Sequence, residues 1–383
     1  MDMGGVHMKY RNFGKLNIQG SAFGLGCMRF NGAASGDSII DEQKAIGLIR
    51  RAIDGGVTYI DTAYVYLDRT SEIVLGKALR DGYRDKVTIA TKMPMEAVHN
   101  RREMEALLAE ELDKLQTDHI DFYLMHGINK KKWAYFKSIG APEFFDDMKK
   151  AGKICYKCFS FHGPYDEFEY IINDWDWDMV QIQYNFMDVD NQAGTKGLKL
   201  AGRLGIPVVI MEGLLGGRLA KAPENVQALY DAFPVKRSPV EWAFRWLCNH
   251  PEIATVLSGC NELEQIEDNL RIFDTVEPNI MSPEELKLMD DVRAAYLART
   301  KIGCTGCRYC MPCPNGVNIP GTFSVWNNVS LYGIDPKLDW GLRQIKEKGE
   351  TPENCVACGA CEAACPQHLG IIECLKAAWG ELN

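Results

Sequence analysis

The sequence lacks the features that would direct it to a membrane, to nucleic acid or to the secretory pathway. No apolar run reaches the roughly 18 to 20 residues that a transmembrane helix needs. Basic residues are not in excess: the formal net charge is −9, so the phosphates of nucleic acid or of an anionic membrane would repel the chain. Residues 1–9 contain no apolar core of a signal peptide. With 14 cysteines and no export signal, we expect a protein of the reducing cytoplasm.

A glycine-rich dinucleotide fingerprint is also absent, and this absence bears on the fold. Short apolar runs alternate with amphipathic stretches up to about residue 300, which is typical of βα units around a parallel sheet. The predicted strands are 23–28, 58–62, 87–93, 120–126, 154–161, 179–184, 207–211 and 254–258. Eight strands with eight helices in roughly 290 residues match a (β/α)8 TIM barrel. An open doubly wound sheet is the alternative, but no G-x-G-x-x-G follows the first strand.

Further elements are predicted around these strands. Residues 8–19 are predicted to form a short hairpin that could close the bottom of the barrel. Helices are expected at 41–54, 71–80, 103–116 and 240–249, and glycines or prolines such as Gly55 and Pro251 punctuate the βα units. A last helix, from Ser282 to about Arg299, would lead to a small, mainly helical domain. We therefore predict two domains, 8–299 and 300–383.

What the sequence does have is a concentration of cysteine near its C-terminal end. One run is Cys304-x2-Cys307-x2-Cys310-x2-Cys313-Pro314, and the other is Cys355-x2-Cys358-x2-Cys361-x3-Cys365-Pro366. The second run matches the bacterial ferredoxin pattern for a [4Fe–4S] cluster. Zinc is the main alternative for paired cysteines, but three evenly spaced cysteines suit a cluster better. We predict two [4Fe–4S] clusters.

In two-cluster ferredoxins, the fourth cysteine of each run binds the other cluster. The predicted ligands of the first cluster are Cys304, Cys307, Cys310 and Cys365, and those of the second are Cys355, Cys358, Cys361 and Cys313. Because the first run has two residues rather than three before its last cysteine, a three-iron cluster or a weakly held site remains an alternative there.

Four polar residues stand at or just beyond the ends of successive predicted strands: Asp61, Tyr66, Lys92 and His126. In a barrel these ends share one face, where active sites lie. A tyrosine next to a lysine that an aspartate holds should have its pKa lowered from about 10, which would make it a usable proton donor. A nearby histidine can orient a carbonyl oxygen by a hydrogen bond. Taken singly, the lysine could be a barrel ion pair and the histidine an interior one.

The segments 59–66, 90–92 and 124–126 resemble the aldo-keto reductases, and the likeness extends from residue 8 to about 295. All four members of that family's catalytic tetrad find a match. The resemblance implies a TIM barrel with Tyr66 as the acid, Lys92 and Asp61 as its tuning pair, and His126 as the orienting group. Together with the two cysteine runs, the chain resembles the iron–sulfur branch of the family, in which a ferredoxin-like domain follows the barrel.

The resemblance also implies a nicotinamide site, with departures from the family pattern. Gln181 and Ser160 match the residues that hold the carboxamide, whereas Met211 replaces the aromatic residue on which the ring stacks. The other residues expected to line the cofactor are Glu212, Leu214, Ser258, Gly259, Gln265, Asp268 and Asn269.

The segment 258–265 has no lysine or arginine to bind a 2′-phosphate, but it carries Glu262 and Glu264. These carboxylates would repel NADP(H), so NAD(H) is favoured over it; they could also be no more than the solvated start of a helix. A flavin is a further possibility.

The main functional hypothesis is an oxidoreductase that reduces a carbonyl or oxidises an alcohol of a small molecule. Hydride transfer moves two electrons and each cluster moves one, so the clusters would connect the barrel to a one-electron carrier such as ferredoxin. One alternative is a ferredoxin-fed reductase that uses a flavin or a substrate radical without nicotinamide. Another is a non-catalytic electron relay or redox sensor. Loop 127–140, with Trp133, Tyr135 and Phe136, is a candidate lid over an anionic or aromatic substrate, or an anchor for the cluster domain.

Overall fold

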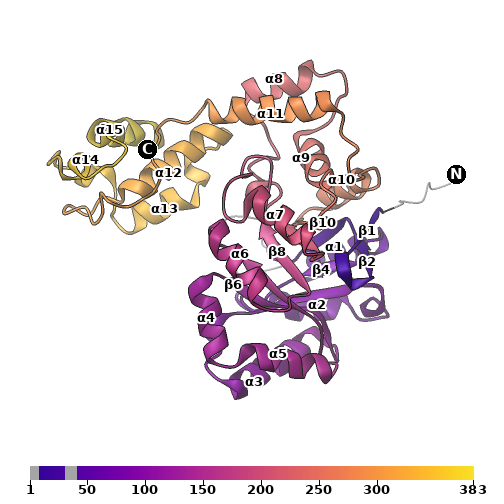
Figure 1. The fold of residues 1–383 in the computed structure, drawn as a ribbon. Coiled ribbons are helices and arrows are strands. Elements are labelled where there is room, and N and C mark those ends of the chain that lie inside the picture. The colour runs from indigo at the N-terminus through magenta and orange to yellow at the C-terminus, as the bar shows by residue number, and fades with distance from the viewer. Residues whose placement is uncertain (1–7, 31–40) are drawn as a thin grey trace. The chain divides into compact units, whose positions relative to one another are not determined.

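The computed structural model describes residues 8–30 and 41–383. These residues form two compact units (Figure 1). The first contains the described residues up to Gly216 together with Glu241–Ser282, and the second contains Gly217–Val240 and Pro283–Asn383. The predicted domain boundary between residues 299 and 300 remains a prediction. Among the described residues, no helix is both long and apolar enough to cross a bilayer.

The first unit is built on a closed barrel of eight parallel strands in the order β10-β3-β4-β5-β6-β7-β8-β9. The strands are β3 (Phe23–Gly26), β4 (Tyr59–Asp61), β5 (Thr88–Met93), β6 (Ile120–Ile128), β7 (Ile154–Phe161), β8 (Met179–Gln183), β9 (Val208–Met211) and β10 (Ile253–Ser258). The predicted TIM barrel is confirmed, and the doubly wound alternative is wrong because β10 pairs with β3 and closes the sheet.

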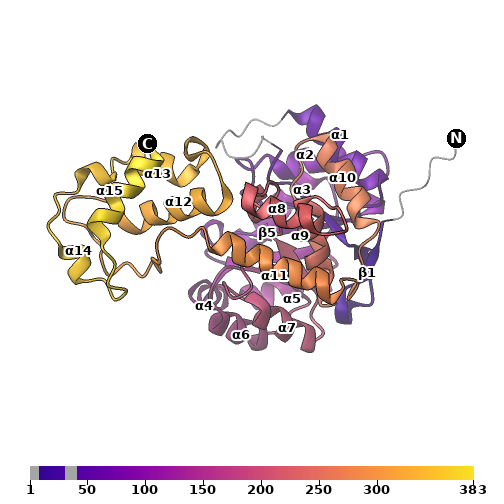
Figure 2. The ribbon, with the colours of Figure 1, turned by 90° about the horizontal axis from the view of Figure 1, so that it is seen from above.

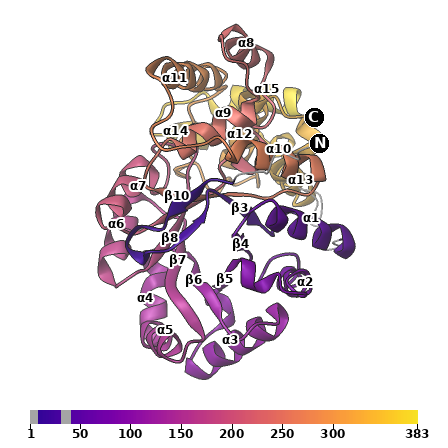
Figure 3. The same cartoon turned by 90° about the vertical axis from the view of Figure 1, so that its right-hand side faces the viewer.

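Helices cover the outside of the barrel (Figure 3). They are α1 (Glu42–Asp54), α2 (Ser71–Ala78), α3 (Arg101–Leu115), α4 (Lys130–Ser138), α5 (Ala141–Lys150), α6 (Tyr165–Asp174), α7 (Gly194–Arg203), α9 (Pro239–Cys248) and α10 (Leu263–Phe273). Their ends follow local chemistry. Asp41 accepts a hydrogen bond from the Lys44 backbone at the start of α1, and Asn100 does the same for Glu103 at the start of α3.

A hairpin closes the N-terminal end of the barrel, as predicted. Strands β1 (Tyr10–Asn12) and β2 (Gln19–Ser21) pair antiparallel, and Phe13 lies between them. The Phe13 ring is 1% exposed and lies 5.9 Å from the ring of Tyr59 and 5.5 Å from that of Phe122. These contacts join the hairpin to the core inside the barrel, so the end opposite the strand carboxyl termini is filled by side chains.

The second unit contains helices α8 (Glu224–Ala232), α11 (Pro283–Leu297), α12 (Ile319–Tyr332), α13 (Trp340–Glu347), α14 (Ala360–Ala363) and α15 (Ile371–Leu382). Helices α12 to α15 lie together around a small core, in which Phe323, Leu342 and Leu375 are buried (Figure 2). This core also contacts six of the cysteines of the two runs and Cys374. The expected mainly helical C-terminal region is confirmed.

Single turns of 3-10 helix complete the described secondary structure. They are η1 (Gly14–Leu16), η2 (Arg84–Lys86), η3 (Met95–Ala97), η4 (Leu215–Gly217), η5 (Pro336–Leu338) and η6 (Pro352–Asn354).

Candidate active site

Strand ends bring the four predicted catalytic residues to one rim of the barrel. Asp61 is the last residue of β4, and Lys92 and His126 lie near the ends of β5 and β6. Tyr66 follows β4 in a tight turn, in which Leu67, Asp68 and Arg69 have the left-handed φ values 52°, 48° and 68°. Three successive residues other than glycine in this conformation are costly, and such strain is characteristic of functional sites. The turn brings the tyrosine back over the rim.

The ammonium group of Lys92 is the centre of this group. Its Nζ donates to Asp61 Oδ1 at 2.6 Å, to the carbonyl oxygen of Thr62 at 2.6 Å and to Tyr66 Oη at 3.3 Å. These three bonds use all three of its donors. The lysine is 1% exposed and the aspartate 3%, so both charges are removed from water and depend on each other.

The protonation states follow from this burial. Burial raises the pKa of Asp61, although Lys92 and Gln181 act against it. Burial tends to lower the pKa of Lys92, but Asp61 and Tyr66 outweigh it and hold the pKa above its usual value. For Tyr66, burial raises the pKa more than the Lys92 charge lowers it. The expected lowering of the tyrosine pKa is therefore wrong in direction, and Tyr66 keeps its proton at neutral pH.

His126 completes the group as a neutral imidazole. Its ring lies edge-on to the ring of Tyr66, with centroids 6.0 Å apart. Burial, helped by the charges of Lys92 and Lys132, lowers its pKa to about 3. A neutral imidazole has one N–H donor and one acceptor, so His126 can donate a hydrogen bond to an oxygen placed near Tyr66.

The predicted carboxamide ligands lie on the neighbouring strands β7 and β8, where Ser160 is directly paired with Gln181. Gln181 on β8 is 1% exposed, and its Nε2 donates to Asp61 Oδ2 at 3.0 Å. Its Oε1 has no hydrogen-bond partner among the described residues. Ser160 on β7 accepts from the backbone of Gly127 at 2.7 Å and still has its own proton to donate. A buried acceptor without a partner is rare in native structures, and the amide N–H of a nicotinamide would satisfy it.

Met211 and the residues after it continue the rim beside Gln181. Met211 ends β9 and is half-buried, Glu212 is exposed with φ 58°, and Leu214 is half-buried. These three residues leave the strand as a turn at the barrel mouth, which is consistent with their predicted contact with a cofactor.

The predicted adenine-end residues are largely bonded to one another. Asn269 Nδ2 donates to Ser258 Oγ at 3.1 Å, and Gln265 Oε1 accepts from the backbone of Asn261 at 2.9 Å. Asp268 pairs with Arg271 at 2.8 Å. Gly259 lies exposed between β10 and α10.

The carboxylate expected to repel a 2′-phosphate is not free. Both carboxylates are exposed, but Glu262 pairs with Lys44 on α1 at 2.7 Å, so its charge is compensated. Segment 258–265 alone does not reveal Lys44, because this lysine lies on α1, after the first strand of the barrel. Barrel closure makes the first and last βα units neighbours, and this adjacency predicts that a cation on α1 can reach Glu262.

The candidate lid is a helix rather than a loop. In α4, Trp133 is 1% exposed and Phe136 is fully buried. The Trp133 indole donates to Asp174 at 2.7 Å, and its ring lies 5.1 Å from the ring of Trp177. The spacing i, i+3 places both aromatic residues on one helix face, and that face packs inward. The lid hypothesis is therefore wrong.

In the second unit, the cysteines gather around two cavities. One is lined by Cys304, Cys307, Cys310 and Cys365. The other is lined by Cys310, Cys313, Cys355, Cys358 and Cys361. Each cavity thus has around it the four thiols that the crosswise pairing assigns to one cluster, and Cys310 borders both. Four thiols around one cavity fit a [4Fe–4S] cluster. The individual ligand assignments remain a prediction.

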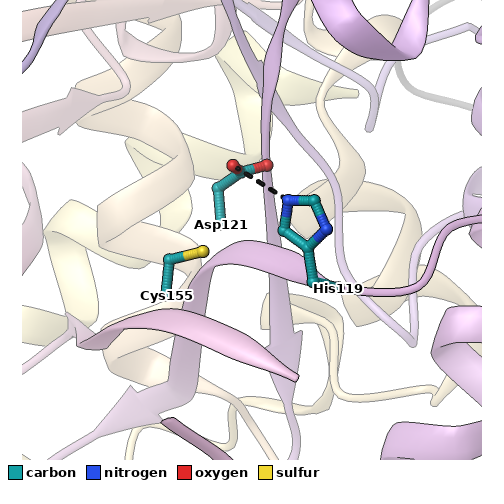
Figure 4. Close-up of side chains that lie close together, drawn as sticks. All are labelled: His119, Asp121 and Cys155. Atoms are coloured by element: carbon teal, nitrogen blue, oxygen red, sulfur yellow. Dashed lines mark ion pairs between the residues drawn. The ribbon is translucent and has the colours of Figure 1, made fainter. Parts of the chain in front are cut away.

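A third group of potential ligands lies at the opposite end of the barrel from Tyr66. His119, Asp121 and Cys155 approach one another at the starts of β6 and β7 (Figure 4). However, Arg84 Nη2 donates to Asp121 Oδ2 at 2.9 Å and to His119 Nε2 at 3.1 Å. A guanidinium already holds the position and the lone pair that a metal would need, so we do not assign a metal site here.

Comparisons with known proteins agree with this geometry. The model of the Aldo/keto reductase family matches residues 22–293, and that of the 4Fe-4S dicluster domain matches residues 303–369. Aldo-keto reductase YhdN of Bacillus subtilis (strain 168) is 38% identical over 127 residues, which cover 31% of this chain and 38% of that protein. Uncharacterized oxidoreductase YqkF of the same organism is 23% identical over 317 residues, covering 74% of this chain and 95% of that protein.

Solved structures share the barrel. The holo form of aldo-keto reductase AKR11C1 from Bacillus halodurans has a TM-score of 0.62 and 24% identity, covering 75% of this chain and 96% of that one. An aldo-keto reductase from Klebsiella pneumoniae in complex with NADPH has a TM-score of 0.59 and 22% identity, covering 75% and 95%. At this identity the likeness concerns the fold. Since the family match spans most of its length, the chain belongs to the aldo/keto reductase family of oxidoreductases and carries a 4Fe–4S dicluster domain after the barrel.

Proposed function

We propose that this oxidoreductase reduces the carbonyl of a small molecule, or oxidises the corresponding alcohol, at the rim formed by Asp61, Tyr66, Lys92 and His126. The observation that carries the proposal is the Lys92 ammonium, which is bonded to both Asp61 and Tyr66. A buried lysine–aspartate pair alone would be a structural ion pair. The further hydrogen bond from Lys92 to the half-buried phenol of Tyr66 allows the pair to stabilise a phenolate.

The proton moves from Tyr66 in the direction of reduction. As negative charge develops on the carbonyl oxygen, the phenol donates its proton to that oxygen, and the resulting phenolate is stabilised by the ammonium of Lys92. Asp61 keeps the lysine charged throughout. Neutral His126 donates a hydrogen bond that holds the carbonyl oxygen near Tyr66. Alcohol oxidation reverses these steps on the same atoms.

A nicotinamide would supply the hydride. The unpartnered Oε1 of Gln181 and the free proton of Ser160 support its carboxamide at this rim. We retain NAD(H) as the proposed form, because segment 258–265 has no cation and Glu264 is exposed. The pairing of Glu262 with Lys44 weakens that preference, and the Klebsiella pneumoniae structure contains NADPH.

The clusters are proposed to exchange single electrons with a carrier such as ferredoxin. Two clusters in one unit can together hold the two electrons of one hydride, which supports their coupling to carbonyl chemistry. We propose Cys304, Cys307, Cys310 and Cys365 for one cluster, and Cys313, Cys355, Cys358 and Cys361 for the other. Oxygen-sensitive thiolate clusters and many free thiols favour the cytoplasm.

The test uses anaerobically prepared full-length protein. NADH and NADPH are titrated by fluorescence, and turnover of 4-nitrobenzaldehyde is measured for the wild type and for Tyr66→Phe. We expect Tyr66→Phe to bind the dinucleotide normally and to lose about 10²- to 10⁴-fold in kcat. An unchanged rate would refute Tyr66 as the acid.

Two further outcomes favour the alternatives. If neither dinucleotide binds but chemically reduced clusters drive aldehyde reduction, the nicotinamide-free reductase replaces our proposal. If the clusters exchange electrons but no carbonyl compound reacts, the relay or sensor replaces it.

A further inference from the structure

The two cysteine runs repeat one backbone pattern. Left-handed φ values occur at equivalent places after the first, second and fourth cysteine of each run. The equivalent pairs are Gly306 (69°) and Ala357 (55°), Arg308 (66°) and Gly359 (75°), and Gly316 (75°) and His368 (52°). In both runs the carbonyl oxygen of the fourth cysteine accepts a hydrogen bond from the backbone three residues later, at 3.0 Å in the first run and 3.1 Å in the second. The two runs can therefore be compared position by position.

Arg308 is the one of these six residues that carries a permanent charge. A left-handed backbone suits glycine and is unfavourable for a long side chain. The second run follows this rule with Gly359, where no atom lies within 4 Å of the place that a Cβ atom would take. The first run has an arginine at the equivalent position. Such strain is characteristic of residues whose side chains have a function.

The charge of Arg308 belongs to one of the two cysteine cavities. Among the described residues that line the cavity of Cys304, Cys307, Cys310 and Cys365, Arg308 is the only charged one. The structure records no ion pair between Arg308 and another described residue. The described residues that line the cavity of Cys313, Cys355, Cys358 and Cys361 include no charged side chain, and most of them are apolar, such as Val317 and Ile372. The two cavities thus differ by one positive charge.

This difference affects the energy of adding an electron. Reduction makes a cluster with four thiolate ligands more negative by one charge, and a nearby cation stabilises that reduced form. An apolar wall has the opposite effect, because it cannot solvate the added charge. The cluster next to Arg308 should therefore have the higher reduction potential.

We propose that Arg308 makes the cluster of Cys304, Cys307, Cys310 and Cys365 the first of the two to be reduced. One electron from a one-electron carrier reduces this cluster by one unit, and the next electron reduces the cluster in the apolar cavity. Arg308 acts through its charge and does not bind iron. The inference rests on the proposed ligands of the two clusters, and it is independent of the carbonyl chemistry proposed for the barrel.

The test is an anaerobic redox titration of the full-length protein with dithionite, followed by electron paramagnetic resonance of the reduced clusters. We expect two midpoint potentials in the wild type. Arg308→Gln should lower the higher one by about 30 to 60 mV, which corresponds to an about 3- to 10-fold weaker uptake of one electron. The effect is moderate because Arg308 is exposed and water and salt screen its charge. Arg308→Lys keeps the charge and should recover most of the shift.

Two further variants locate the effect. Gly359→Arg places an arginine at the equivalent position of the second run, between Cys358 and Ala360 of the other cavity wall. It should raise the lower midpoint and narrow the difference between the clusters. Lys337→Gln is the matched control, since Lys337 is an exposed cation of the same unit that lines neither cavity. It should change the uptake of an electron by either cluster less than about twofold.

The outcomes separate this inference from the proposed clusters. If iron analysis shows that the wild type does not hold two clusters, the proposed ligands and this inference both fail. If both clusters are present but titrate together, or if Arg308→Gln leaves the higher midpoint unchanged or lowers only the other one, this inference alone fails. Loss of iron from Arg308→Gln would assign the arginine a structural role and would also overturn the inference.

Discussion

The two compact units build their sites by different means. In the barrel, strands place Asp61 and Lys92 at 3% and 1% exposure, and the charges are joined by direct hydrogen bonds. In the second unit, the cysteines stand half-buried or exposed on turns and on the four-residue helix α14. In the barrel, Asp61, Lys92 and Tyr66 are held together by their own hydrogen bonds. The cysteine sites contain thiols that need a bound group to hold them together, and this dependence separates the two units experimentally.

The largest effect is expected from removing a cluster ligand. Cys361→Ala should cost the protein iron and make the second unit sensitive to protease, because metal–ligand bonds there supply folding free energy. The barrel should keep its secondary structure, and NADH-dependent aldehyde turnover should stay within about twofold if the units are independent. Iron analysis, limited proteolysis and circular dichroism measure this. Cys374→Ser, outside both runs, is the control. Retained protease resistance without iron would remove the contrast between the units.

The next effect concerns the buried charges of the barrel. Lys92→Met should abolish carbonyl turnover and lower the free energy of unfolding by about 3 to 5 kcal/mol, since Asp61 is left buried and unpaired. Adding Asp61→Asn should recover much of that stability without recovering activity. Urea unfolding followed by tryptophan fluorescence, together with kcat, separates the two roles. If Lys92→Met were as stable as the wild type, the site would not depend on this pair.

A third effect concerns a buried carboxyl group that lies outside the catalytic site. Glu111 on α3 is fully buried, and burial next to Glu72 raises its pKa well above the usual value. A raised pKa in the folded state means that stability is lost as pH rises above about 4.3, the value for unfolded chains. Glu111→Gln does not titrate and keeps an acceptor for the hydroxyl of Tyr123, which donates to Glu111 at 2.6 Å.

Relative to the wild type, Glu111→Gln should therefore gain about 1.4 kcal/mol per pH unit until the folded pKa is reached. Urea midpoints at increasing pH measure this gain. The neighbour Glu110 has the opposite shift: although burial acts to raise its pKa, Lys114 and Arg69 hold it below the usual value. Glu110→Gln should therefore lose less than about 1 kcal/mol at neutral pH. Equal pH profiles for Glu111→Gln and the wild type would contradict the protonated state of Glu111.

The smallest effect concerns cofactor choice. Glu262→Gln frees Lys44 from its ion pair, so NADPH should bind several-fold more tightly while NADH changes little. Glu267→Gln, which frees Arg51 on the same two helices, is the control. A parallel gain for both dinucleotides would show that the pair does not discriminate between them.

The sequence predicted the barrel well because its strands are short, apolar on both faces and separated by clear helix stops, as at Gly55 after α1. The catalytic rim could also be anticipated, since residues at successive strand ends must meet once a barrel closes. What escaped prediction depends on contacts across the fold. The direction in which the pKa of Tyr66 shifts depends on whether burial outweighs the charge of Lys92. The pairing of Glu262 with Lys44 depends on the packing of α1 against α10. The inward packing of Trp133 could not be predicted either, because it depends on residues 130–138 forming a helix, where a loop was expected.

The packing of Phe13 into the N-terminal end of the barrel has a consequence for how ligands enter and leave. Because side chains of the described residues fill that end of the barrel, we expect substrate and cofactor to reach Tyr66 from the opposite rim, at the carboxyl ends of the strands. When two ligands enter from the same rim, they bind in order: the ligand that lies deeper has to bind first and dissociate last. Steady-state kinetics should accordingly be ordered, with the deeper ligand appearing as the leading substrate in product-inhibition patterns.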